Sequence, residues 1–211
     1  MSRHPDTTHR REKERGGKDF KLACAILDDA RIGHVGFTLQ GFPYVVPMAC
    51  ARDGDQLLLH GSVASRLVKG LAGGLNCCVT VTHLDGIVLA RSAFHSSMNY
   101  RSVMIFGQAE RVQDPDLKQA GLDRLVEHLI PGRLRELRPS SRKELSATHL
   151  LSLPIRVFTT KVRTGPPSDP KPDLDLALWA GVVPLRQVPG PPEAAPDLRF
   201  DLPEPDYLSR L

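Results

Sequence analysis

The chain has 211 residues, 41% of them hydrophobic and 25% charged, and a formal net charge of +4. This length suits one domain, or two at most, and a chain of this size can bury a stable core without disulfide bonds or bound metals. The balanced composition excludes a disordered chain. The basic surplus forms no continuous stripe with interleaved aromatic residues, which argues against a nucleic-acid partner.

No apolar run reaches the roughly 20 residues that a membrane-spanning helix needs. The amino terminus lacks a signal-peptide pattern, because Asp28 and Asp29 interrupt the apolar stretch behind it. We therefore expect a cytoplasmic protein. Its four cysteines have neither C-x-x-C nor zinc spacing, and as small hydrophobes they are expected to be reduced and mostly buried.

The first patterned segment follows a polar stretch, residues 1–17, that is typical of a flexible tail. Apolar residues at spacings of three and four then predict a helix over residues 20–30. Period-two runs at 31–39, 42–51 and 56–60 predict three strands joined by turns. Ser62 is predicted to cap a short helix that ends at Gly73-Gly74.

Alternation continues over residues 75–83, which predicts a half-buried strand. Asp85-Gly86 is a strong turn signal. Further strands are predicted at 87–93 and 100–112, separated by an irregular polar segment at 94–99.

Asp114 followed by Pro115 predicts a helix start, and Pro131-Gly132 ends that helix. Ser141 and Glu144 have the spacing of a capping box, which predicts another short helix. Residues 151–162 return to a strand pattern.

Eleven of the 18 prolines and the single tryptophan, Trp179, lie after Gly165. This segment must be largely irregular, although residues 174–185 are apolar enough to lie against the body. Six or more strands joined by hairpins predict a mainly β fold with peripheral helices. A small antiparallel barrel is the simplest solution, because closure removes exposed strand edges.

The segment LHGSVASR, residues 59–66, is the first candidate site, because it leads from a strand end into a helix start. Backbone N–H groups at such a junction bind anions. Ser62 and Ser65 add hydroxyl groups, and Arg66 adds a guanidinium that suits a phosphate. The alternative is that Ser62 only caps the helix and Arg66 is a solvated surface residue.

The segment SSMNYRSV, residues 96–103, is the second candidate. Tyr100 offers a ring for stacking, Arg101 a cation and Ser102 a hydroxyl group. Arg101 and Ser102 must point to opposite faces of a strand, so both can serve one small pocket only if it wraps the strand edge. A turn with a salt bridge is the alternative.

Three histidines on neighbouring strands or loops, His60, His83 and His95, would permit a metal or haem site. No pair has helical metal spacing and no acidic partner recurs beside them, so the sequence predicts no metal site. The motifs of serine hydrolases, nucleoside triphosphatases and Rossmann dehydrogenases are absent.

The segments FPYVVPMAC, DQLLLHGSVASRLVKGL and, most specifically, HSSMNYRSVMIFGQAERV resemble the pyridoxamine 5′-phosphate oxidase-like flavoproteins. The resemblance runs from about Phe20 to Lys161. It is nearest to the flavin-nucleotide-binding branch that includes the nitroimidazole-resistance proteins. It implies the FMN-binding split β-barrel fold.

The resemblance implies that one strand, Val45–Cys50, runs along the flavin and that Ser65 and Arg66 contact its phosphate. Leu67 stands where the oxidases have a lysine, and Ser102 where they have a glutamine that reaches the flavin ring. Together with the two candidate segments, the predicted cofactor-binding residues are Val45, Val46, Pro47, Met48, His60, Gly61, Ser62, Ser65, Arg66, Tyr100, Arg101, Ser102 and Trp179.

We therefore expect a flexible tail (1–17), a flavin-binding split barrel (18–163) and a proline-rich extension that packs on the barrel (164–211). The resemblance implies a homodimer with FMN between the subunits. The expected function is an oxidoreductase acting on a small organic substrate, with no nucleic-acid or membrane partner and with His60 nearest the reacting atom. The alternative is a non-catalytic flavin carrier or sensor, or a haem-binding protein that uses His60 or His95.

Overall fold

The computed structural model describes residues 5–8, 10 and 12–210. The strands within this part of the chain are β1 (Gly16–Gly17), β2 (Ile32–Leu39), β3 (Phe42–Asp53), β4 (Gln56–Ser62), β5 (Asn76–Leu89), β6 (Ser97–Gln108), β7 (Glu110–Arg111), β8 (Thr148–Pro154), β9 (Val157–Arg163) and β10 (Gly181–Pro184). The helices are α1 (Phe20–Asp28), α2 (Arg66–Ala72), α3 (Pro115–Leu129) and α4 (Arg142–Ala147). Short 3-10 turns lie at η1 (Lys13–Arg15), η2 (Arg133–Glu136), η3 (Lys171–Asp175) and η4 (Asp206–Arg210).

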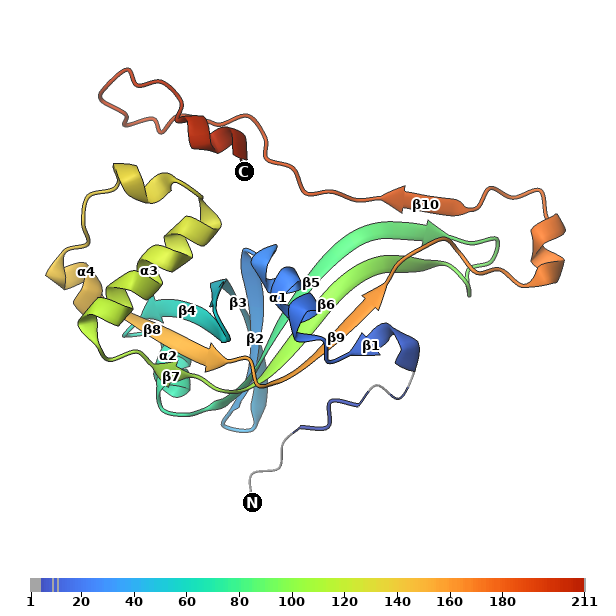
Figure 1. Cartoon of the computed structure of the whole chain (residues 1–211), viewed down its shortest axis with the longest axis horizontal. Coiled ribbons are helices and arrows are strands. Elements are labelled where there is room, and N and C mark those ends of the chain that lie inside the picture. Colours follow the sequence, from blue (N-terminus) through green and yellow to red (C-terminus); the bar gives the residue numbers. More distant parts are fainter. Residues whose placement is uncertain (1–4, 9, 11, 211) are drawn as a thin grey trace.

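All strand pairs described are antiparallel, in the order β1-β9-β6-β5-β2-β3-β4-β8-β7, and β10 pairs with the far end of β5. The sheet curls into a half-open barrel with the helices at its periphery (Figure 1). This arrangement confirms the predicted mainly β split barrel. None of the helices in the described ranges has both the length and the apolar character needed to span a membrane.

Two helices, α3 and α4, start at the caps that the sequence predicts, and α2 does not. Asp114 accepts hydrogen bonds from two backbone N–H groups of the first turn of α3, and Pro115 occupies the first helical position. Ser141 and Glu144 form the reciprocal capping box of α4. The cap of α2 is Ser65 rather than Ser62. Ser62 instead accepts a hydrogen bond from the Ala64 N–H in the turn before the helix.

The main core fills the concave side of the sheet, where α1 and α2 cover it. Its fully buried members include Ile26 of α1, Leu71 of α2, and Val35, Leu59 and Ile105 of the sheet. A second, smaller core lies between the opposite side of β3, β4 and β8 and helix α3, and contains Ala51, Leu58, Leu125 and Leu150. The sheet therefore has one side wholly covered and one side covered only under α3.

Two strand predictions were wrong because long-range pairing overrode local signals. Asp85-Gly86 does not form a turn, because β5 runs through it with a bulge and stays paired to β6. The bulge directs the Asp85 carboxylate onto Arg101. The predicted strand 151–162 is divided into β8 and β9, because Ile155 donates its N–H to the carbonyl of Asp55 where the chain passes between the two halves of the barrel.

The last part of the polar stretch 1–17 lies in secondary structure. Residues 1–4, 9 and 11 lie outside the described residues. Gly16 and Gly17 form β1 and pair with β9, so the tail prediction does not hold for this pair. Gly17 also contacts Thr160 closely enough that a side chain there would crowd it.

The segment after β9, residues 164–210, is called the arm. It contacts the rest of the chain at β10, at Asp169, which pairs with Arg91, and at Tyr207, which hydrogen-bonds to Arg133 of η2. Between these contacts it crosses above the barrel (Figure 1). The prediction that residues 174–185 lie against the body holds only for β10, since Leu174 and Trp179 are more than half exposed.

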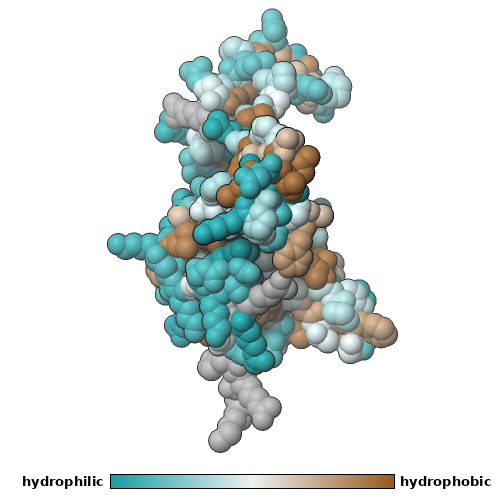
Figure 2. Space-filling model, turned by 90° about the vertical axis from the view of Figure 1, so that its right-hand side faces the viewer, coloured by the Kyte–Doolittle hydropathy of each residue, from teal (hydrophilic) through white to brown (hydrophobic). Residues whose placement is uncertain are grey.

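Apolar side chains remain exposed along much of the arm. Val188, Phe200 and Leu202 are each more than 60% exposed. Figure 2 shows brown patches among hydrophilic side chains in the upper part of the molecule, where Figure 1 places the arm. An extended segment of this kind is held at both ends but is poorly covered by its own chain.

Candidate functional site

The convex side of the sheet, called the outer face, carries part of the predicted site. Strand register places Ile32 beside Ala49, His34 beside Pro47 and Thr82 beside Ser102. These side chains alternate with core residues such as Val35, so they point away from the core. Val45 and Ile32 on this face are more than half exposed. An exposed, partly apolar surface is thus available next to the part of the sheet that α3 covers.

His60 lies at the border between the open outer face and α3. It is half-buried, shares its side of β4 with Leu58 and stands opposite Leu150 of β8. Its Nδ1 atom is buried and has no hydrogen-bond partner among the described residues. Burial lowers the pKa of His60. A neutral imidazole with an unused nitrogen can ligate a metal or accept a proton.

This lowered pKa predicts acid sensitivity of the fold. Below the ordinary histidine pKa of about 6.5, the unfolded chain takes up a proton that the folded His60 resists. The free energy of unfolding is therefore expected to fall as pH drops from about 7 toward the lowered pKa, and His60→Gln should flatten this slope. Urea unfolding at several pH values measures it, and an unchanged slope in His60→Gln would contradict the prediction.

The corner between β4 and α2 contains Gly61, Ser62, Ser65 and Arg66. A side chain on Gly61 would meet a Val68 methyl group at 2.6 Å, so the strand and the helix approach closely here. The Ser62 hydroxyl accepts a hydrogen bond from the Ala64 N–H in the turn, and the Ser65 hydroxyl accepts one from the Val68 N–H at the helix start. Ser65 therefore caps α2 and Ser62 stabilises the turn before it, and each hydroxyl can still donate a hydrogen bond of its own.

Arg66 is exposed and places its guanidinium 5.4 Å from the centre of the Tyr44 ring. Tyr44 in turn stacks on Phe37, with 5.3 Å between ring centres. This stack holds the arginine near the start of β3. Tyr44 also lines an open groove of about 1200 Å³, together with Val45, Cys78 and Phe106. Cofactor sites are typically hollows of comparable volume that combine apolar and polar lining.

The other predicted residues of β3 divide between the two faces. Val45 and Pro47 lie on the outer face, whereas Val46 and Met48 point toward the core and pack against it. Only the backbone and two of the four side chains are therefore available to a ligand on the outer face.

Tyr100, Arg101 and Ser102 follow the predicted alternation. Ser102 is on the outer face and donates a hydrogen bond to the Lys161 carbonyl at 3.2 Å. Arg101 is on the opposite face, where its guanidinium donates hydrogen bonds to the carboxylates of Asp85 and Asp29, which raise its pKa in that order of effect. In this chain the Arg101 guanidinium is therefore engaged in a salt-bridge network.

The structure divides the predicted residues between the two faces of the sheet and the arm, and those on the outer face do not meet at one point. Two strands, β2 and β5, separate β3 from β6. At about 4.8 Å per strand, the Val45–Met48 segment and Ser102 lie about 14 Å apart across the sheet. Trp179 is 70% exposed on the arm and packs against Gly181. A single chain thus supplies separate parts of the predicted site.

The three histidines singled out in the sequence also lie apart. His83 is hydrogen-bonded to the Ile26 carbonyl at 2.9 Å, on the side of α1. His95 lies near the tip of the β5–β6 hairpin, where Asp169 and Asp173 of the arm approach it.

Sequence reasoning missed two residues near the site. One is Tyr44, whose stack with Phe37 and Arg66 depends on strand pairing. The other is His149 on β8, which stands opposite Gly61 and has a buried Nδ1 without a partner among the described residues. Burial, and secondarily the positive charges of Arg111 and Lys118, lower the pKa of His149. The sequence offered one signal for His149: it is a histidine in an apolar strand that directly follows a capped helix.

An antiparallel sheet curled into a half-open barrel, with a few peripheral helices, is the split β-barrel fold. Residues 21–162 match the pyridoxamine 5′-phosphate oxidase family. The chain therefore belongs to this family. None of the curated protein sequences matches the chain.

Two solved structures are similar over nearly their whole length. The flavocytochrome Anf3 from Azotobacter vinelandii is 42% identical, with a TM-score of 0.91, covering 98% of this chain and 96% of that one. The FAD and haem binding protein from Mycobacterium smegmatis is 39% identical, with a TM-score of 0.89, covering 93% and 96%. A proposed 5-nitroimidazole antibiotic resistance protein from Bacteroides thetaiotaomicron is 27% identical, with a TM-score of 0.59, covering 70% and 86%.

Proposed function

We propose that this protein is a flavin-binding redox protein that also binds haem. The observation that carries this proposal is the similarity, at 39% and 42% identity over more than 90% of each chain, to two proteins described as binding FAD and haem or as a flavocytochrome. A bound flavin supplies hydride or one-electron chemistry, and a haem supplies one-electron chemistry.

The extent of the similarity favours haem in addition to flavin. The nitroimidazole-resistance relative covers only 70% of this chain, whereas the two haem-associated proteins cover 93% and 98%. An alignment that covers 93% or more of this chain must include most of the arm, residues 164–210. The arm is thus shared with the proteins that are described with a haem.

In this proposal the flavin phosphate end lies at the corner of Ser62, Ser65 and Arg66, and the backbone of Val45–Met48 lies along the flavin. Arg66 supports this placement, because it is an exposed guanidinium that makes no ion pair with a carboxylate of the described residues. The relative from Mycobacterium smegmatis, which is described as binding FAD and haem, favours FAD over the FMN predicted from the sequence.

A homodimer completes the site in this proposal. Tyr100 and Ser102 lie too far across the sheet to reach a flavin beside β3 of their own chain, so a second copy would supply them. The exposed outer face and the uncovered apolar residues of the arm support this pairing, because burial of each large apolar side chain contributes about 1.5–3 kcal/mol. A closed pair with a two-fold axis is the simplest assembly.

His60 is the proposed haem ligand and proton-handling residue. It is neutral, half-buried and has an unused nitrogen beside the open face. His95 is a poorer candidate, since its Nδ1 is engaged with Ser92 and two carboxylates lie next to it. Oxidoreductase activity on a small organic substrate is part of this proposal.

The cofactors can be tested on the purified full-length protein. We expect absorbance bands of both a flavin and a haem, and FAD rather than FMN in the extract after denaturation and chromatography. Arg66→Ala should weaken flavin binding by roughly 1.5–3 kcal/mol, the scale of a charge-assisted hydrogen bond. Arg142→Ala, an exposed arginine on α4, is the matched control. Equal flavin affinity in both variants would show that Arg66 does not contact the flavin.

His60→Ala separates the two cofactors. We expect this variant to keep its flavin and lose its haem band, and free imidazole should restore the band by occupying the vacated ligand position. Loss of flavin with retained haem would contradict the assignment. Protein that takes up neither cofactor would overturn the proposed function.

A further inference from the structure

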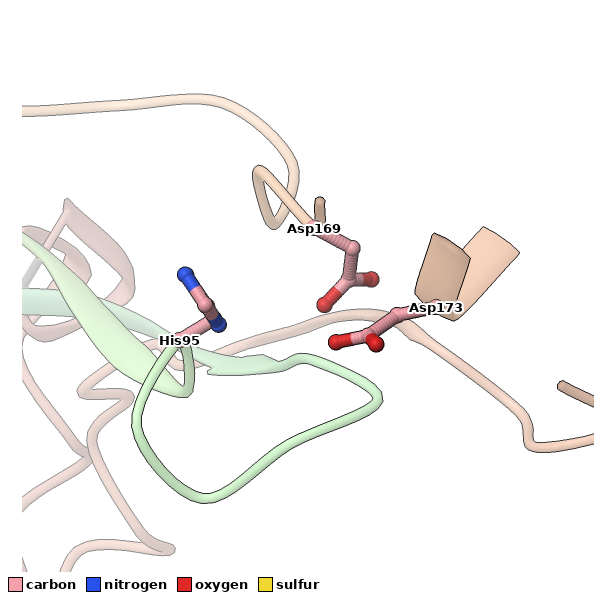
Figure 3. Close-up of side chains that lie close together, drawn as sticks. All are labelled: His95, Asp169 and Asp173. Carbon is pink, nitrogen blue, oxygen red and sulfur yellow. The ribbon is translucent and has the colours of Figure 1, made fainter. Parts of the chain in front are cut away.

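Three side chains from distant parts of the sequence meet where the arm passes the tip of the β5–β6 hairpin. His95 comes from the loop between the two strands, and Asp169 and Asp173 come from the arm around η3 (Figure 3). One imidazole nitrogen and one oxygen of each carboxylate all lie within 4.8 Å of one another. All three residues are half-buried.

Neighbouring groups hold these side chains in place. The Ser92 hydroxyl lies 2.8 Å from Nδ1 of His95, which leaves Nε2 without a partner among the described residues. Asp169, whose side chain is 1% exposed, accepts hydrogen bonds from the Arg91 backbone N–H and from its guanidinium, at 3.0 and 2.9 Å. Such outer contacts orient the histidine and carboxylate ligands of metal sites.

The charges of the two carboxylates are only partly balanced by neighbouring cations. Arg91 balances Asp169, whereas Asp173 has no basic partner within ion-pair distance in the part of the chain that is described. No hydrogen bond or ion pair joins His95 to either carboxylate in the same residues, although their atoms are close. Two carboxylates and one imidazole around a shared space therefore carry one uncompensated negative charge.

We propose that His95, Asp169 and Asp173 bind a divalent transition-metal cation of the Zn²⁺ type. Zinc accepts a histidine nitrogen and carboxylate oxygens, and a water can complete four-fold coordination beside three protein ligands, as it does in catalytic zinc sites. The cation would fasten the arm to the hairpin tip. This site is separate from the outer face and does not depend on the proposed flavin or haem.

The proposal can be tested on the full-length protein after chelator treatment and dialysis. Calorimetric titration with zinc chloride is expected to show one tight site per chain. His95→Gln and Asp173→Asn should each weaken it by at least about 30-fold, because even the loss of outer-shell partners costs 10–100-fold in metal affinity. Asp175→Asn, in the same turn of the arm, is the matched control and should bind zinc like the wild type.

A second readout follows from the position of the site. Zinc should protect the chain from proteolysis between Gly165 and Gly181 in the wild type and in Asp175→Asn, but not in His95→Gln or Asp173→Asn. Equal melting temperatures of all four proteins in chelator would show that the substitutions leave the fold intact. The absence of a stoichiometric site, or equal zinc affinity in His95→Gln and Asp175→Asn, would overturn the proposal and leave a metal-free contact of imidazole and carboxylates.

Discussion

A chain that ends at Gly165 is expected to fold as a barrel but to purify as a monomer without haem. Neither hydrophobic core contains a residue beyond Phe158, so the barrel keeps its packing when the arm is removed. The arm, by contrast, exposes Val188, Phe200 and Leu202, whose burial against a second copy would contribute about 1.5–3 kcal/mol each. Loss of these contacts should shift the dimer equilibrium by several orders of magnitude.

Analytical ultracentrifugation and the haem absorbance measure this effect, and thermal unfolding verifies that the barrel is intact. In the full-length chain, Phe200→Ser should weaken the dimer, whereas Arg199→Ser, its exposed neighbour, should not. A truncated protein that remains dimeric and retains haem would show that the arm contributes to neither.

Replacement of Gly61 by valine is expected to destabilise the fold and to weaken flavin binding together. A Cβ at this position would lie 2.6 Å from a Val68 methyl group, and Val68 is 2% exposed on α2. The stiff, buried valine cannot turn away, so α2 must shift from β4. Overpacking of this kind costs typically 1–3 kcal/mol. The same shift displaces Ser65 and Arg66 from the proposed phosphate position.

Urea unfolding and flavin titration measure the two consequences. Gly190→Val is the matched control, since a side chain there meets no atom within 4 Å. A Gly61→Val protein with wild-type stability would mean that the strand and the helix can separate freely. Loss of stability with unchanged flavin affinity would place the flavin elsewhere.

Local signals predicted most elements where the decisive interactions are local. The starts of α3 and α4 depend on caps within four residues, namely Asp114 with Pro115 and Ser141 with Glu144, and both helices begin there. The hairpin of β2 and β3 likewise follows its Gln40-Gly41 turn. The Asp85-Gly86 prediction failed because pairing with β6 on one edge and β10 on the other favours a continuous strand.

The candidate site was predictable only in part. Alternation within a strand correctly separated Arg101 from Ser102. It did not indicate that Asp29 and Asp85 would engage Arg101, because these acidic residues approach it through α1 and through a bulge. The carboxylates beside His95 lie more than 70 residues away in the sequence, so spacing rules for metal ligands could not find them.

The sequence by itself determined the antiparallel barrel, the starts of α3 and α4 and the presence of a basic strand-to-helix corner, because these depend on periodicity, turns and caps within short windows. Only the tertiary structure decided that His60 of β4 and Ser102 of β6 lie on the same outer face of the sheet. It also placed three strands, β3, β2 and β5, between them. It also decided that the arm meets its own chain at a few points and leaves its apolar residues uncovered. Curvature of the sheet and pairing between distant segments set these distances, and no local pattern encodes them.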